Sequence, residues 1–96
     1  MIGRFVISRA GHDKDQLYVV VGQEADCVFV CDGKTRTLAR PKKKKEKHVQ
    51  PINRCVNDDL LKRLREASGT GQTSVRDEEI KYEIRQYLAL HRNDTV

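Results

Sequence analysis

Two neighbouring β-prone segments in the first third of the chain are apolar on both of their faces. Within residues 16–22 and 26–31, apolar side chains occupy odd-numbered and even-numbered positions alike. A strand with one face in water instead alternates apolar with polar side chains. We therefore predict that one face of these strands lines a small barrel and that another part of the chain covers the other face.

Three further segments complete a predicted five-stranded barrel. The predicted strands span residues 2–9, 16–22, 26–31, 34–39 and 48–53. A polar turn at residues 11–15 joins the first two strands. The pair Asp32-Gly33 predicts a two-residue hairpin between the third and the fourth. Pro51 confines the fifth strand to an edge of the sheet, because proline has no N–H to donate to a neighbouring strand.

The apolar residues of the second half recur with the spacing of a helix. The first predicted helix begins after the N-cap Asn57 and is ended by Gly69 and Gly71. The second spans about residues 75–91 and begins at the capping pair Ser74 and Asp77. Their apolar faces consist of Leu60, Leu61, Leu64 and Ala67, and of Ile80, Ile84, Tyr87, Leu88 and His91. We predict that these helices cover the outer face of the barrel.

The fold class that follows is α+β, with a small five-stranded barrel and two C-terminal helices. Residues 1–54 form the barrel with a basic loop, and residues 55–96 form the helical extension. A chain of 96 residues has room for one modest core and no deep cleft.

Positive charge is concentrated in the predicted barrel. Residues 1–54 hold 12 Lys and Arg against 6 Asp and Glu, a net charge of +6, whereas residues 55–96 have a net charge of −1. A localised basic region favours a polyanionic partner, and nucleic acid is favoured over a membrane because no basic amphipathic helix accompanies it. A solvated surface without a partner is the alternative.

A run of lysines follows the predicted fourth strand. The cationic residues of this run and its flanks are Arg40, Lys42, Lys43, Lys44, Lys45, Lys47 and His48. Flexible lysine side chains can pair with several phosphates and release condensed counterions, and about six contacts would give a logarithmic salt slope on the order of −4 to −5. The alternative is a solvated loop that keeps a barrel edge soluble.

Two turns carry further cationic residues that we predict to make additional, less important contacts with RNA. The first, between the first two strands, contributes Arg9, His12 and Lys14, and the predicted hairpin contributes Lys34 and Arg36. Loops on a rigid scaffold often carry binding residues. Simple turn chemistry is the alternative, with Gly11 supplying backbone freedom and Asp13 a side-chain cap.

The ordered set of turn and strand residues resembles a known family. The set comprises Ser8, Ala10-Gly11-His12-Asp13-Lys14, a Val-rich strand, Asp32-Gly33, Leu38, Pro41-Lys42 and Lys47-His48. Residues 3–21 and 32–50 are similar to KOW-type SH3-like barrels, most closely to the KOW-domain RNA-binding proteins of bacteria. These in turn look like the N-terminal barrels of archaeal and eukaryotic large-subunit ribosomal proteins. The resemblance implies association with the ribosome or with ribosomal RNA.

One position departs from the family pattern. The family often has glycine where this chain has Asp15. Asp tolerates the left-handed backbone region better than most residues, so we expect the turn to form. The negative charge puts direct phosphate contact by that turn in doubt.

Catalytic and metal-binding patterns are absent from the sequence, so we expect neither an enzyme nor a cofactor. No nucleophile, base and orienting group fall into a recognisable motif. Cys27 and Cys31 would lie about 13 Å apart on an extended strand, too far to share one zinc ion. We interpret the three cysteines, which include Cys55, as reduced thiols.

The aromatic residues of the predicted strands are expected in the core. These are Phe5, Tyr18 and Phe29. Readers of RNA sequence usually expose rings on which bases stack. Their predicted burial favours recognition of phosphate, sugar and helix shape.

Taken together, these patterns predict a non-catalytic RNA-binding protein of the translation machinery. The predicted partners are ribosomal RNA or the ribosome, with ribosomal proteins as further candidates and no membrane. No apolar stretch approaches a membrane span and the first residues lack a signal-peptide pattern, so we expect a cytoplasmic protein. The alternative is a protein-interaction adaptor that uses the barrel and the stripe of Ile80, Ile84, Tyr87 and Leu88.

Overall fold

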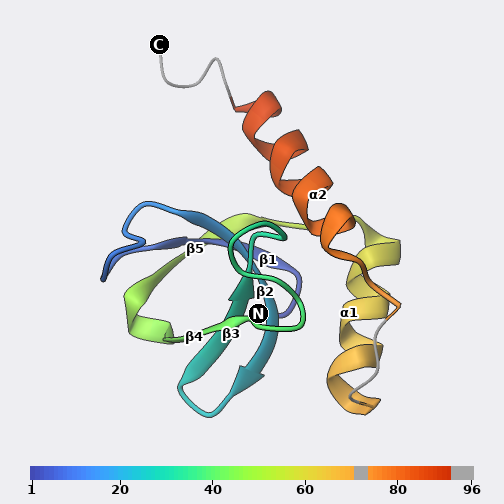
Figure 1. Ribbon diagram of the computed structural model, residues 1–96, viewed down its shortest axis with the longest axis horizontal. Helices are drawn as coiled ribbons and strands as arrows, with labels where there is room; N and C mark the ends of the chain where they lie inside the picture. Colours follow the sequence, from blue (N-terminus) through green and yellow to red (C-terminus); the bar gives the residue numbers. More distant parts are fainter. Residues whose placement is uncertain (71–73, 92–96) are drawn as a thin grey trace.

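The computed structural model describes residues 1–70 and 74–91 as a five-stranded antiparallel sheet followed by two helices (Figure 1). The strands are β1 (Arg4–Ser8), β2 (Leu17–Glu24), β3 (Cys27–Cys31), β4 (Lys42–Lys45) and β5 (Val49–Cys55), and the helices are α1 (Asp58–Thr70) and α2 (Asp77–Leu90). A 3-10 turn, η1 (Glu46–His48), joins β4 to β5. The predicted fold class, a small α+β barrel-like fold with two C-terminal helices, is confirmed.

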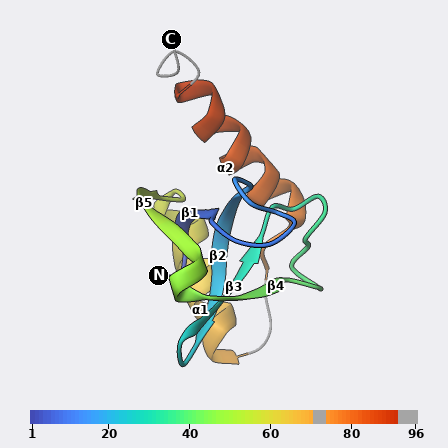
Figure 2. The ribbon, with the colours of Figure 1, turned by 90° about the vertical axis from the view of Figure 1, so that its left-hand side faces the viewer.

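The strand order leaves the curled sheet with two edge strands. The order is β4-β3-β2-β1-β5, so that β4 and β5 are the two edges and η1 links them. Pro51 lies in β5, which pairs only with β1, and the predicted edge position is therefore confirmed. The curled sheet has its helices on one side, with α2 running past the barrel (Figures 1 and 2).

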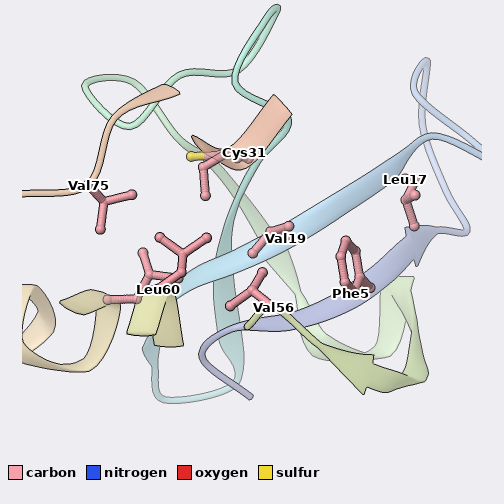
Figure 3. Packing of buried hydrophobic residues seen from close by; sticks show 9 residues of the cluster. Phe5, Leu17, Val19, Cys31, Val56, Leu60 and Val75 are labelled. Atoms are coloured by element: carbon pink, nitrogen blue, oxygen red, sulfur yellow. The ribbon is translucent and has the colours of Figure 1, made fainter. Parts of the chain in front are cut away.

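Both faces of the central strands are buried, each in a different hydrophobic cluster. The cluster inside the barrel consists of Val6, Tyr18, Val20, Val28, Val30 and Val49. The outer cluster consists of Phe5, Leu17, Val19, Cys31, Val56, Leu60, Leu64, Val75 and Ile80, most of which Figure 3 labels. Tyr18 and Val30, only 3% and 0% exposed, are buried in the barrel interior. Leu60 and Leu64 of α1 and Ile80 of α2 join the outer cluster, which confirms that the helices cover the outer face of these strands.

The connection between β3 and β4 differs from the predicted hairpin. Residues 32–41 form a loop, and the predicted strand at 34–39 is wrong. Asp32 organises the loop, because its Oδ1 accepts the backbone N–H groups of Lys34 at 2.9 Å and Arg36 at 2.8 Å. Gly33 has a φ of 77°, and a Cβ at this position would collide with the carbonyl oxygen of Asp77. The loop is thus held against the start of α2, an interaction that a local turn signal does not contain.

The helix ends agree with the predictions at the end of α2, where Leu90 is the last helical residue, and at the start of α1. There, Asn57 Oδ1 accepts the Leu60 N–H at 2.9 Å and caps the helix as predicted. The predicted stop at Gly69 is wrong, since α1 continues to Thr70, and Gly71 lies outside the described residues. The second helix begins after Arg76, whose N–H donates to Glu79 Oε2 at 3.3 Å. Arg76 therefore replaces the predicted cap at position 74.

The predicted apolar stripe of α2 packs against the barrel at Ile80, Ile84 and Tyr87 but not at Leu88. Ile80 is fully buried and the ring of Tyr87 stacks on that of Phe5 with centroids 5.0 Å apart. Leu88 is 55% exposed and Leu90 61%, so the predicted stripe is wrong at Leu88. Helix α2 extends past the sheet that it covers (Figure 1), and its last turn has less barrel surface to pack on.

Candidate nucleic-acid interface

The lysine run is a strand, and its register divides the four lysines between two faces. Each residue of β4 pairs with one of β3, with Lys42 opposite Val30, Lys43 opposite Phe29, Lys44 opposite Val28 and Lys45 opposite Cys27. Directly opposed residues point to the same face of a sheet. Because Val28 and Val30 line the barrel interior, Lys42 and Lys44 lie on the inner face. Lys43 and Lys45 lie on the outer face, and the predicted flexible basic loop is wrong at these four positions.

Asp13 forms ion pairs with both inner lysines. Lys44 Nζ lies 2.8 Å from Asp13 Oδ1 and donates to the carbonyl oxygen of Ala10 at 3.0 Å, and the residue is only 8% exposed. Lys42 Nζ lies 3.2 Å from Asp13 Oδ2. The charge of Lys44 is therefore used inside the protein, and the predicted phosphate contact does not fit its buried position.

Asp13 also accepts hydrogen bonds from two hydroxyl groups on the neighbouring strands. Ser8 Oγ donates to Asp13 Oδ1 at 2.8 Å, and Tyr18 OH donates to Oδ2 at 2.7 Å. Burial by itself would raise the pKa of Asp13, but these bonds and those from the lysines outweigh it and lower the pKa far below the ordinary 3.8. Burial and the bond to Asp13 raise the pKa of Tyr18. The carboxylate thus ties the β1–β2 turn to both β2 and β4.

The β1–β2 turn meets η1 on the side of the barrel away from α1 (Figure 1, and facing the viewer in Figure 2). The Arg9 N–H donates to the His48 carbonyl oxygen at 2.8 Å. Asp15 has a φ of 74°, which confirms the expected left-handed turn, and its carboxylate lies 3.6 Å from the Arg9 guanidinium. The turn and η1 therefore form one surface. Part of the charge of Arg9 is balanced by Asp15.

The predicted contact residues differ in exposure. The exposed ones are Arg9, His12, Lys14, Lys34, Arg40, Lys43, Lys45 and Lys47; Arg36, Lys42 and His48 are half-buried and Lys44 is buried. Lys43, Lys45 and Lys47 follow one another along β4 and η1, and η1 meets the turn that carries Arg9. We call Arg9, Lys43, Lys45 and Lys47 the basic edge.

The 32–41 loop forms a second basic region with α2. Leu38 N–H donates to Asp77 Oδ1 at 2.8 Å and anchors the loop to the helix. A groove of about 430 Å³ lies beside it, lined by Gln16, Asp32, Lys34, Lys81, Ile84, Arg85, Leu88 and Ala89. The sequence predictions missed Lys81 and Arg85, although their spacing of four residues on a predicted helix was a signal that they share a face.

The structure places the three aromatic strand residues differently from one another. Phe5 and Tyr18 are buried in the two clusters, as predicted. Phe29 is half-buried and belongs to neither cluster, so its predicted core position is wrong. Its ring lies on the outer face of β3, with Lys43 Nζ 5.9 Å from the ring centroid.

The cysteines are free thiols in three different environments. Cys31 is buried, and its burial raises the pKa of the thiol to about 12. Cys27 is half-buried and Cys55 is exposed. Within residues 1–70 and 74–91, no three His, Cys, Asp or Glu side chains are grouped so that they could hold a metal ion.

Comparison of the sequence with models of protein families and with curated proteins found no match. In the part of the chain that the structure describes, neither helix is long and apolar enough to cross a membrane.

Proposed function

We propose that the protein is a non-catalytic RNA-binding protein of the translation machinery that docks on ribosomal RNA in the cytoplasm. The observation that carries the proposal is the basic edge, in which exposed Lys43, Lys45 and Lys47 follow a rigid strand and its 3-10 turn. The resemblance to KOW-domain RNA-binding proteins supports the same function. The barrel fixes the backbone positions of these lysines before binding, which lowers the entropy cost of docking on phosphates.

Because Lys42 and Lys44 form ion pairs with Asp13 inside the protein, we expect the affinity for RNA to depend less strongly on salt. Of the six Lys and Arg residues in the run and its flank, four remain exposed: Arg40, Lys43, Lys45 and Lys47. About four phosphate contacts give a logarithmic salt slope on the order of −3. This slope is shallower than the value expected if all six cations contacted phosphates.

The proposal is tested with a variant that removes charge only from the basic edge. Lys43, Lys45 and Lys47 are changed together to Gln, which leaves the Asp13 network intact. A matched control removes the same charge from exposed positions on or next to the helices, Lys62→Gln, Arg65→Gln and Arg76→Gln, and leaves in place the backbone N–H of Arg76 that bonds to Glu79.

We expect the basic-edge variant to bind ribosomal RNA more weakly and with a flatter salt dependence. The control variant should bind with nearly the affinity and salt dependence of the unaltered protein. Equal losses in both variants would mean that only net charge matters. Unaltered protein that ignores ribosomes and RNA in dilute buffer would refute the proposed function.

A second candidate function is a protein-interaction adaptor, and it is favoured by the apolar surface of α2. Leu88 and Leu90 are exposed, and Leu88 lines the groove beside the 32–41 loop. Co-sedimentation with ribosomes separates the two functions. Loss of the protein from the ribosome pellet after ribonuclease or high salt supports RNA binding, whereas retention under both conditions supports a protein contact.

A further inference from the structure

The outer face of β3 and β4 carries an aromatic ring that the fold does not use. Phe29 packs into neither hydrophobic cluster, although a buried phenyl ring contributes more apolar area than most side chains. The helices cover the same face only further along β3, where Cys31 joins the outer cluster. The ring therefore lies on a part of the sheet that the helices do not cover, where it is half-buried.

The strand register places a glycine beside this ring. The pairing of β2 with β3 shifts by one residue between Val20 and Gly22, which places Gly22 directly opposite Phe29. A Cβ at Gly22 would lie only 3.4 Å from the ring atom Cδ2 of Phe29. The ring thus lies beside a residue that has no side chain to cover it.

Two ammonium groups of the basic edge share the face with the ring. Lys43 lies opposite Phe29 and Lys45 lies opposite Cys27, so both point outward beside it. Lys43 Nζ is 5.9 Å from the ring centroid. Glu24, opposite Cys27, is the acid that the strand register places on this face. A π-face beside cations is the combination that binds single-stranded nucleic acid, because bases stack on the ring while lysines neutralise phosphates.

We propose that Phe29, with Lys43 and Lys45, is a stacking site for an unpaired RNA base. The inference rests on the proposed RNA-binding function and adds a substrate class to it, namely RNA with a single-stranded loop, bulge or end rather than continuous duplex. Lys43 swings from the ring to the adjacent phosphate when the base binds. The competing explanation is that the stem of Lys43 only shields the ring from water.

The chain contains no tryptophan, so a Phe29→Trp variant carries a single indole at the site. Its fluorescence is followed while a single-stranded oligouridylate of about ten nucleotides or a matched RNA duplex is added. Tyr82→Trp, on an α2 side chain that is 55% exposed, is the matched control. Binding itself is measured separately, by anisotropy of labelled RNA.

Stacking predicts quenching of the Phe29→Trp variant by the single strand, weak quenching by the duplex and none in the Tyr82→Trp control. It also predicts that Phe29→Leu weakens single-strand binding about fivefold or more and leaves duplex binding and the melting temperature unchanged. RNA binding without quenching would overturn the stacking site while leaving the proposed function in place. The absence of any RNA binding would overturn both.

Discussion

The Asp13 network offers a sharp test of how the barrel closes. Asp13→Asn keeps the shape of the side chain but removes its charge. The ammonium of Lys44, whose side chain is 6% exposed, then has no counter-ion and stays next to Lys42. One carboxylate oxygen also becomes an NH2 group, which faces either Ser8 and Lys44 or Tyr18 and Lys42, and both members of each pair are donors themselves.

The expected loss of stability is large for a chain of this size. Breaking a buried ion pair by removing one partner costs about 3–5 kcal/mol, and small domains have about 5–15 kcal/mol in total. A loss of about 3 kcal/mol corresponds to a fall in melting temperature on the order of 15 °C. Urea denaturation followed by circular dichroism measures the free energy of unfolding directly.

A double-mutant cycle identifies the cause of that loss. Lys44→Met removes the buried cation and leaves Asp13 with Lys42 and two hydroxyl donors, so we expect a loss of about 1–2 kcal/mol. In the Asp13→Asn background, the same change removes the unpaired charge and should recover about 1.5 kcal/mol or more. The explanation by an unpaired buried charge would be refuted if the losses in the free energy of unfolding of the two single variants simply added in the double variant. It would also be refuted if Asp13→Asn lost less than about 1 kcal/mol.

The pH dependence of stability gives an independent measurement of the same network. The pKa of Asp13 is lower in the folded protein than the ordinary 3.8 of an unfolded chain. Its contribution to stability is therefore present above that value and is lost as pH falls below it, because the unfolded chain then binds the proton first. The gap in stability between unaltered protein and Asp13→Asn should narrow from pH 5 to pH 3, and a constant gap would contradict this assignment.

Three further predictions concern the helices and the loop. Leu60→Ala, in the cluster shared by α1 and the sheet, should cost about 3 kcal/mol in urea denaturation and keep a single transition, since barrel and helices share this core. Gly33→Ala should cost about 2 kcal/mol or more, because of the positive φ and the collision with the carbonyl oxygen of Asp77; a neutral effect on melting would contradict the close approach of loop and helix. Leu88→Glu should change stability by less than about 0.5 kcal/mol, because the side chain is 55% exposed, and a larger loss would show that it packs on the barrel.

The sequence contained the information for the layers of the fold. Apolar residues at both odd and even positions of β2 and β3 required two buried faces, and the structure provides two clusters. Asn57 was recognisable as a cap because the signal and the bond it makes lie within three residues. The same holds for Asp15, whose left-handed backbone follows from the residue type and its place in a turn.

The makeup of the candidate RNA-binding surface depends on contacts between residues that are far apart in the sequence. The lysine run has no alternation of its own, so the faces of Lys42 to Lys45 follow from their register on β3. Lys44 is buried because that register brings it to Asp13, 31 residues away in the chain. Phe29 lies outside both hydrophobic clusters because the helices cover β3 only near Cys31.

By itself, the sequence determined the barrel-and-helix plan, the concentration of positive charge in the barrel half, and the local caps and turns. Each of these depends on composition or on neighbours a few residues apart. The tertiary structure alone decided which lysines carry free charge, which aromatic ring is left outside the core, and where the second helix leaves the barrel. Strand register and helix position are set by the packing of the whole chain, and they determine which side chains reach the surface.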